Sequence, residues 1–335
     1  MNPFDPDMAS MIHSEMRKHG IKLVLGYTVE GFKEKDNGVE ILLKDNPSLH
    51  ADMVVLAIGV TPDTALAKEA GLELGIKGSI IVNDRMETSV PDIYAAGDAV
   101  QVKHYVTGND ALISLAGPAN KQGRIIADNI CGGDSHYLGS QGSSVIKVFD
   151  MTAATTGINE TNAKKSGLEV DTVILSPMSH AGYYPGGKVM TMKVVFEKET
   201  YRLLGAQIIG YEGVDKRIDV LATAIHAGLK ATQLKDLDLA YAPPYSSAKD
   251  PVNMAGFMID NIAKGTLKQW HLEDMDKISK DKNAVLLDVR TVGEFSRGHI
   301  NGFKNIPVDE LRERINEVEK GKPVYLICQS GLRSY

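Results

Sequence analysis

Two short apolar runs near the C-terminal end constrain the fold of this chain most. Residues 284–290 and 323–328 are predominantly apolar segments, with the length and composition of strands buried on both faces of a parallel sheet. Residues 308–318, between them, carry apolar side chains at helical spacing. A strand, a helix and a second strand predict a small α/β unit. The second strand ends at Cys328, which places its sulfur at the carboxyl end of that strand.

The loop that follows Cys328 indicates sulfur chemistry. Residues 328–334 (Cys-Gln-Ser-Gly-Leu-Arg-Ser) can turn backbone N–H groups toward the sulfur, and Arg333 adds positive charge. Both features favour the thiolate, which is the nucleophilic form. Together with residues 288–307, this loop resembles the rhodanese signature. The resemblance implies a catalytic Cys328 that carries a persulfide sulfur, whereas a buried structural cysteine is the alternative.

A second motif lies at residues 88–98 (Thr-Ser-Val-Pro-Asp-Ile-Tyr-Ala-Ala-Gly-Asp). We expect a short strand at residues 93–96, which would place Asp98 at a sheet edge where ligands bind. Gly97 lets a ligand approach the backbone closely. The motif resembles the second flavin-contacting segment of the pyridine nucleotide-disulfide oxidoreductases. The resemblance implies that Asp98 binds the ribityl chain of FAD, whereas a capping aspartate is the alternative.

Two further segments support the flavoprotein resemblance. Residues 115–124 open a predicted helix, and in this family the start of that helix faces the isoalloxazine ring of the flavin, so we expect cofactor contacts from Leu115, Ala116, Gly117, Pro118 and Ala119. Residues 53–58 form an apolar run, predicted as a buried strand that ends at Gly59. In the family this glycine lets the nicotinamide nucleotide pass closely.

The branch of the family is indicated by residues 3–9 and 241–256, which look like those of coenzyme A disulfide reductases and NADH oxidases. That branch uses tyrosines contributed by a partner subunit, so the resemblance implies a homodimer. The best candidates here are Tyr241 and Tyr183, with Tyr184 and Tyr245 behind them. A tyrosine hydroxyl can donate to a developing thiolate at neutral pH, because its pKa lies near 10. Packing at a subunit interface is the alternative role.

The expected fold class is α/β, with a partial two-dinucleotide-binding-domain flavoprotein, an α+β dimerisation domain and a partial α/β rhodanese domain. We expect residues 1–73 to complete an NAD(P)-binding domain and residues 74–143 to complete an FAD-binding domain. In the first of these, the spacing of apolar residues predicts a helix around residues 8–16, and residues 21–29 and 39–43 are predicted strands with a turn at residues 36–38. Residues 144–270 would form the dimerisation domain, residues 271–283 a linker, and residues 284–335 the first part of the rhodanese domain. Neither Gly-x-Gly-x-x-Gly motif of such flavoproteins occurs, so we expect both, and the redox cysteine, upstream of residue 1.

Composition excludes several other functions. The 335 residues carry a net charge of −6 with mixed signs, which argues against nucleic acid as a partner. No apolar run has the length of a membrane span, and we expect neither a membrane partner nor a metal site. The two cysteines lie far apart, which favours a reducing cytoplasm over a disulfide framework. Cys131 stands at a predicted helix end and is expected to be inert.

The expected activity follows from these resemblances. They imply an FAD- and NAD(P)H-dependent reductase of coenzyme A disulfide, coenzyme A persulfide or polysulfide, coupled to a sulfur-carrying rhodanese domain. Coenzyme A would be a substrate or a bound ligand. An NADH oxidase or peroxidase is one alternative, and an inactive module that retains only a dimerisation surface is another. The sequence leaves the choice between NADH and NADPH open.

Overall fold

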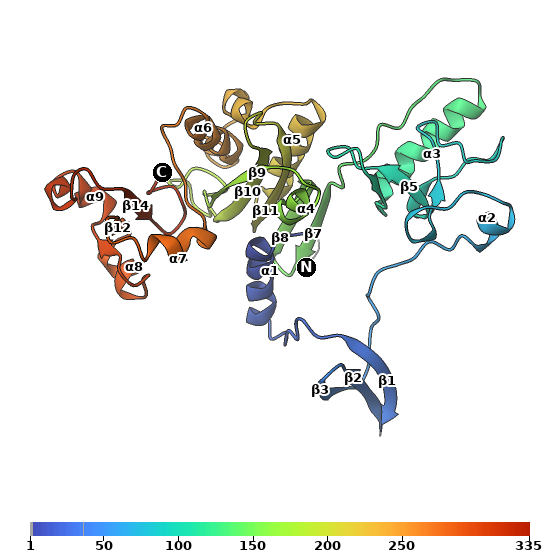
Figure 1. The fold of residues 1–335 in the computed structure, drawn as a ribbon, viewed down its shortest axis with the longest axis horizontal. Helices are drawn as coiled ribbons and strands as arrows, with labels where there is room; N and C mark the ends of the chain where they lie inside the picture. The colour runs from blue at the N-terminus through green and yellow to red at the C-terminus, as the bar shows by residue number, and fades with distance from the viewer. Residues whose placement is uncertain (1–2, 36) are drawn as a thin grey trace. The chain divides into compact units, whose positions relative to one another are not determined.

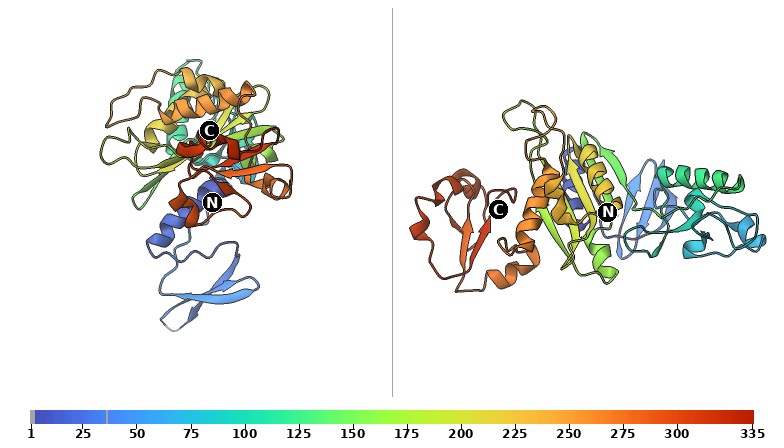
Figure 2. Two further views of the ribbon diagram at one scale, coloured as in Figure 1. Left: turned by 90° about the vertical axis from the view of Figure 1, so that its left-hand side faces the viewer. Right: turned by 90° about the horizontal axis from the view of Figure 1, so that it is seen from above.

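The computed structural model describes residues 3–35 and 37–335 (Figure 1). The chain divides into two compact units. One contains residues 13–140, and the other combines residues 3–12 with residues 141–335. Each unit is described by itself below, and Figure 2 gives two further views. Within the described ranges, no helix combines the length and the apolar character that crossing a bilayer requires.

The first half of the residue 13–140 unit is an antiparallel sheet. Its strands are β1 (Val29–Lys35), β2 (Gly38–Leu43) and β3 (Asn46–Ala51), in that order. The strand predicted over residues 39–43 is therefore confirmed, and β3 was not foreseen. The turn predicted at residues 36–38 includes Asp36, which lies outside the described residues. Helix α1 (Pro6–Lys18), predicted from apolar spacing, precedes the sheet and is followed by Gly20 with a positive φ of 79°.

Two strand predictions in the first half of this unit are wrong. Residues 21–28 form no strand, and pairing begins only at Val29. Residues 53–58 also form no strand, and their side chains lie in solvent, with Met53 76% and Ile58 90% exposed. A strand buried on both faces needs a paired neighbour on each side and a layer above and below it. No described segment of this unit supplies these to residues 53–58.

The second half of this unit is a small mixed sheet with one long helix. Its elements are α2 (Ala65–Glu69), β4 (Ile80–Ile81), β5 (Val100–Lys103), β6 (Asp110–Ala111) and α3 (Ala116–Ile130). Met86, Val100 and Val102 form its buried core. The strand predicted at residues 93–96 is wrong, because only Tyr94 makes a single bridge, to Glu87. Asp98 consequently lies in a 3₁₀ turn, η2 (Gly97–Ala99), that leads into β5.

The other unit is built on a five-stranded antiparallel sheet with strand order β7-β8-β11-β10-β9. The strands are β7 (Ser144–Val148), β8 (Met151–Gly157), β9 (Val170–Leu175), β10 (Met190–Glu197) and β11 (Leu203–Gly210). Its helices are α4 (Glu160–Lys165), α5 (Val214–His226) and α6 (Pro251–Ala263), of which α5 and α6 lie together over the sheet (Figure 1). Every residue of β11 is buried, so this strand is the centre of the core.

An ionic cluster fastens residues 3–12 to this sheet. The Lys193 side chain on β10 is 2% exposed, and its Nζ lies 2.8 Å from Asp7, 3.2 Å from Asp5 and 2.7 Å from Glu160. The Asp5 carboxylate also accepts hydrogen bonds from Thr161 and from Gln207. A buried ammonium requires such compensation, because leaving water costs an ion several kcal/mol.

The C-terminal part of the same unit is the predicted small α/β unit. Strand β12 (Val285–Asp288) pairs in parallel with β13 (Lys304–Asn305) on one side and β14 (Val324–Ile327) on the other. Its helices are α7 (Met275–Ile278), α8 (Val292–Ser296) and α9 (Val308–Leu311). The helix predicted over residues 308–318 is too long, since α9 stops at Leu311 and only a 3₁₀ turn (Ile315–Glu317) follows.

Candidate functional site

Cys328 follows β14 directly, and its sulfur lies within a ring of hydrogen-bond donors. The Ser334 hydroxyl lies 3.4 Å from Sγ, and backbone N–H groups of Ser330, Arg333 and Ser334 also donate to it. Burial raises the pKa of the Cys328 thiol, but these hydrogen bonds outweigh burial, so that the pKa lies below its ordinary value. The loop therefore stabilises the thiolate, as the sequence predicted.

Arg333 lies near this sulfur but is engaged elsewhere. Its guanidinium makes a two-pronged ion pair with Glu294, with N–O distances of 2.8 and 2.7 Å. Glu294 belongs to a capping box with Thr291 at the start of α8. The pKa of Glu294 is strongly lowered, first by Arg333 and then by Thr291. Glu294 thus anchors the far end of the Cys328 loop. The Thr-x-x-Glu pattern was visible in the sequence, but its partner was not.

Two residues of the rhodanese-like signature make contacts within the domain. Asp288 is fully buried, and its carboxylate accepts hydrogen bonds from the backbone N–H and the guanidinium of Arg290, with N–O distances from 2.7 to 3.0 Å. The His299 ring stacks on Phe295 with centroids 3.8 Å apart. Both arrangements give these two residues a structural part in the domain.

A groove of about 700 Å³ runs beside Cys328. One wall comes from β14 and the loop after it, and the other comes from β9, α6 and residues 267–270. Two hydrogen bonds hold the walls together, from Ser176 N to Ser330 O at 3.1 Å and from Trp270 Nε1 to Leu326 O at 3.2 Å. The groove gives the sulfur an approach that is lined mostly by apolar side chains.

The candidate tyrosines meet in a second place on this unit. The hydroxyls of Tyr183 and Tyr241 lie 2.6 Å apart, although the residues are 58 positions apart in sequence. Both side chains are exposed, Tyr183 by 76% and Tyr241 by 44%. The pKa of Tyr241 is raised, first by this hydrogen bond and then by burial. One hydroxyl of the pair donates to the other, and the accepting hydroxyl keeps its own proton free to donate outward.

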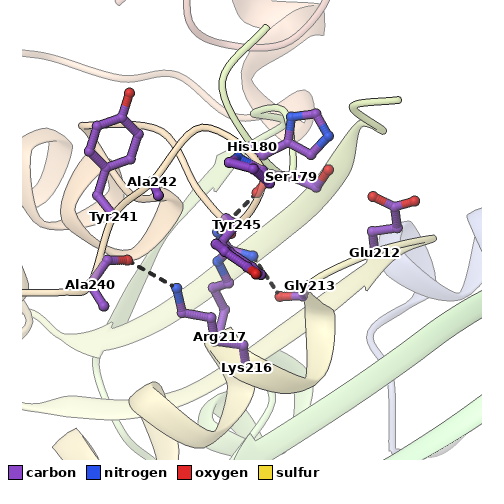
Figure 3. Close-up of a pocket in the computed structure, with 11 residues that line it drawn as sticks. Ser179, His180, Glu212, Gly213, Lys216, Arg217, Ala240, Tyr241, Ala242 and Tyr245 are labelled. Carbon is purple, nitrogen blue, oxygen red and sulfur yellow. Dashed lines mark hydrogen bonds between the residues drawn. The ribbon is translucent and has the colours of Figure 1, made fainter. Parts of the chain in front are cut away.

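A cavity of about 480 Å³ lies beside Tyr241 (Figure 3). Its lining includes Tyr245, the other tyrosine candidate of this loop, together with Lys216, Glu212 and His180. Tyr184 lies outside this lining and packs edge-to-face on the His180 ring, with centroids 5.6 Å apart. The structure thus pairs Tyr183 with Tyr241 and leaves the other two tyrosines out of the pair.

Arg217 is a residue of this site that the sequence did not reveal. Its side chain is 1% exposed and pairs with Asp250, the N-cap residue of α6. The Asp-Pro pair at residues 250–251 is a recognisable helix start, but nothing in the sequence joins it to Arg217 on α5.

The predicted flavin residues gather at the start of α3. Gly97 has a φ of 82°, which favours glycine, and its N–H donates to the buried Gln122 on α3 at 2.7 Å. This bond holds the Asp98 turn against the helix. Leu115 is the N-cap residue and makes no side-chain capping bond, while Ala116 and Gly117 are exposed. An exposed carboxylate thus lies near backbone N–H groups that helix geometry leaves without acceptors.

Two other residues named in the sequence analysis lie outside these sites. Gly59 has a φ of 96° and lies in the exposed segment after residues 53–58, with open space around its Cα. Cys131 is the exposed C-cap residue of α3.

Comparisons with known families identify the regions of the chain in which these residues lie. Residues 1–123 match the pyridine nucleotide-disulphide oxidoreductase family, and residues 143–251 match the dimerisation domain of the same family. Residues 271–335 match the rhodanese-like domain.

Individual proteins are also similar to the chain. The NAD(P)H sulfur oxidoreductase (CoA-dependent) of Pyrococcus abyssi is 37% identical over 74% of this chain and 55% of its own length. The crystal structure of reduced Bacillus anthracis CoADR-RHD matches with a TM-score of 0.95 and 46% identity, over 100% of this chain and 60% of that one. A NAD-dependent persulfide reductase from A. fulgidus matches with a TM-score of 0.89 and 40% identity, over 99% and 60%.

The chain spans 55% to 60% of the length of these three proteins. The predicted fold class, a flavoprotein-type α/β region followed by dimerisation and rhodanese domains, is confirmed. This chain belongs to the pyridine nucleotide-disulphide oxidoreductase family and carries a rhodanese-like domain after the dimerisation domain.

Proposed function

We propose that the protein is an FAD-dependent NAD(P)H oxidoreductase that reduces coenzyme A disulfide, coenzyme A persulfide or polysulfide, with sulfane sulfur carried on Cys328. The observation that carries the proposal is the ring of donors around the Cys328 sulfur, in a chain that also has the flavoprotein family's domains. A thiolate held in this way can attack the outer sulfur of a sulfane donor, which breaks that sulfur's bond to the donor, releases the rest of the donor as an anion and leaves the sulfur on Cys328 as a persulfide. Covalent linkage of the two activities raises the effective concentration of the intermediate.

The residues around η2 and α3 fit a flavin. The exposed Asp98 carboxylate can accept hydrogen bonds from sugar-type hydroxyls, and the N–H groups of Ala116 and Gly117 can donate to a ring carbonyl. When bound, FAD supplies two-electron transfer between a nicotinamide and a sulfur–sulfur bond. The positive end of α3 would stabilise negative charge placed there. Gly59 would border the nicotinamide nucleotide.

Tyr183 and Tyr241 are proposed to serve the reduction from a partner subunit in a homodimer. Cleavage of a disulfide or persulfide releases a thiolate, and a hydroxyl at hydrogen-bond distance can protonate or stabilise it. The 2.6 Å contact between the two hydroxyls supports a shared role. We also propose a cytoplasmic location, because both cysteines are free thiols and a persulfide carrier needs its thiol reduced.

The test is anaerobic NAD(P)H oxidation by the whole protein, with coenzyme A persulfide compared with coenzyme A disulfide. Wild type and Cys328→Ser are measured with each substrate and with an added sulfane donor. Faster turnover with persulfide, and loss of donor-dependent turnover in the variant, is the expected result. In a parallel aerobic assay, oxidation of NAD(P)H by dioxygen with no response to either coenzyme A substrate would instead establish the NADH oxidase alternative.

A further inference from the structure

Both loops that carry the tyrosine pair are hydrogen-bonded to one buried side chain, that of Arg217. The first loop, residues 179–187, carries Tyr183, and the second, residues 240–250, carries Tyr241. Arg217 Nη2 donates to Ser179 O at 3.0 Å in the first loop and to Tyr245 O at 3.4 Å in the second. Figure 3 shows its guanidinium lying between the two loops, below Tyr241.

Further contacts fix the guanidinium itself. Its Nε and Nη2 bind Asp250 Oδ2 at 3.2 and 3.0 Å, and Nη1 donates to Gly213 O at 3.1 Å. Gly213 adopts a φ of 68°, and a Cβ at that position would lie within 2.0 Å of Nη1. The glycine therefore leaves the room that the guanidinium occupies.

Ser246 connects the two loops directly. Its hydroxyl donates to Asp250 Oδ2 at 2.7 Å and lies 3.1 Å from Arg217 Nη2. Its carbonyl accepts the N–H of Ala181 at 2.9 Å, two residues before Tyr183. Ser246 is fully buried, so these contacts are shielded from water.

An arginine suits this position for a geometric reason. Its planar guanidinium presents several donors in a fixed arrangement, and one nitrogen here serves acceptors on both loops. A lysine carries one compact charge, which could pair with Asp250 but could not reproduce the fixed arrangement of donors that serves both loops. A buried ion pair is in itself a weak source of stability compared with apolar packing. The hydrogen bonds of the guanidinium instead fix where the two loops lie.

We propose that Arg217 is a positioning residue for the Tyr183–Tyr241 pair, which it holds in hydrogen-bond contact by fastening both loops through Ser179, Tyr245 and Ser246. The inference rests on the proposed function for any effect on turnover. Its structural part, contact between the two hydroxyls, can be measured without turnover. The hydrogen bonds of Arg217 go to the two loops and to residues around them, and not to the two tyrosine hydroxyls.

The structural part is tested by NMR of the protein labelled with ¹³C at tyrosine Cζ, at one fixed pH. Tyr183→Phe gives the resonance position of Tyr241 without its partner, and Tyr241→Phe assigns the signal. Arg217→Lys is expected to move the Tyr241 resonance to the position seen in Tyr183→Phe. Ser246→Ala, a milder change, is expected to move it in the same direction. A Tyr241 resonance that stays at its wild-type position in both variants would overturn the inference.

Lys193→Met is the matched control. It also removes a buried cation paired with carboxylates in the same unit, but the ion pairs of Lys193 involve neither tyrosine loop. The Tyr241 resonance is expected to stay in place in this variant even though the protein is less stable. A shift in the control as large as in Arg217→Lys would show that general loosening moves the tyrosines, and would overturn the specific role of Arg217.

A kinetic cycle tests the effect on turnover. Arg217→Lys is expected to lower kcat about tenfold in the wild-type background, and less than about twofold in a Tyr183→Phe background, because both changes break the same unit. Equal losses in both backgrounds would overturn the positioning role. If Tyr183→Phe alone keeps full activity while the NMR shifts appear, the proposed role of the tyrosines fails and the positioning of the pair stands.

Discussion

At the scale of single residues, the reactivity of Cys328 depends on a balance between burial and hydrogen bonds. Burial disfavours the thiolate, and the Ser334 hydroxyl with three backbone N–H groups favours it. The backbone donors come with the shape of the loop, so a side-chain substitution leaves them in place. The Ser334 hydroxyl is the donor that mutation can remove without changing the backbone.

Ser334→Ala is expected to raise the pKa of Cys328. In wild type the lowered pKa means that the thiolate is present at a pH where an ordinary cysteine is still protonated, and it is lost only as pH falls through the lowered value. The measurement is the rate of iodoacetamide alkylation against pH, in a Cys131→Ser background because Cys131 is exposed. An unchanged midpoint in Ser334→Ala would show that the hydroxyl does not stabilise the thiolate.

Tyr241→Phe is expected to lower kcat by about a hundredfold, the usual contribution of a positioned proton donor, with little change in KM. Tyr183→Phe should have a smaller effect, because Tyr241 keeps its own hydroxyl. Tyr245→Phe serves as the control, since Tyr245 lies on the same loop but outside the hydroxyl pair. Steady-state kinetics of the whole protein check the order, and a larger loss in Tyr245→Phe than in Tyr241→Phe would contradict it.

Residue-scale prediction from the sequence worked where a local pattern encodes the chemistry. The Cys328 loop was predictable because its donors are its own backbone. The tyrosine pair was predictable only as separate candidates, because its 2.6 Å contact joins two loops far apart in sequence. Arg217 was not predictable, since its partners are mainly backbone carbonyls, which have no sequence signature.

At the scale of elements, the Lys193 cluster shows how a segment and a sheet are fastened. Burial raises the pKa of Asp5 and of Glu160. Their hydrogen bonds and the charge of Lys193 lower both pKa values by more than burial raises them, so that each pKa lies below its ordinary value. Burial lowers the pKa of Lys193, and its contacts with Asp7 and Glu160 raise it above its ordinary value. The charged forms of all these groups therefore stabilise the fold at neutral pH.

Lys193→Met is expected to destabilise the unit by about 3 kcal/mol, since it leaves the buried Asp5 carboxylate without its cation. In wild type, groups with lowered pKa values give stability that is present above about pH 4 and is lost as pH falls through the folded values. The variant should lose less stability over that acidic range. Urea unfolding at several pH values measures this, and parallel pH curves for the two proteins would contradict the role of Lys193.

Elements were predictable where one periodicity suffices. The apolar runs at residues 284–290 and 323–328 gave β12 and β14 because their partners lie within the same small unit. The run at residues 53–58 has equal strand character and forms no strand, because strand formation depends on neighbours that periodicity does not report. Residues 93–96 likewise form no strand, because Tyr94 makes one isolated bridge and the segment has no continuous pairing with a neighbouring strand.

At the scale of the whole molecule, one chain combines a flavoprotein-type region with a rhodanese-like region that is proposed to carry sulfur. The groove beside Cys328 has a wall from the dimerisation region as well as one from the rhodanese-like region, so the two are structurally continuous. Sedimentation velocity is expected to give a mass twice that of one chain. A monomer at micromolar concentration would contradict a partner-subunit role for Tyr183 and Tyr241.

The most direct measurement is mass spectrometry of the Cys328 peptide during sulfur transfer. The protein is incubated anaerobically with a sulfane donor and coenzyme A, and samples are taken before and after NAD(P)H is added. The peptide is expected to gain the mass of one sulfur atom when the donor is present and to lose it after NAD(P)H is added, as sulfide appears. A peptide that never gains sulfur, or that keeps it in the presence of NAD(P)H, would contradict the coupling of the two activities.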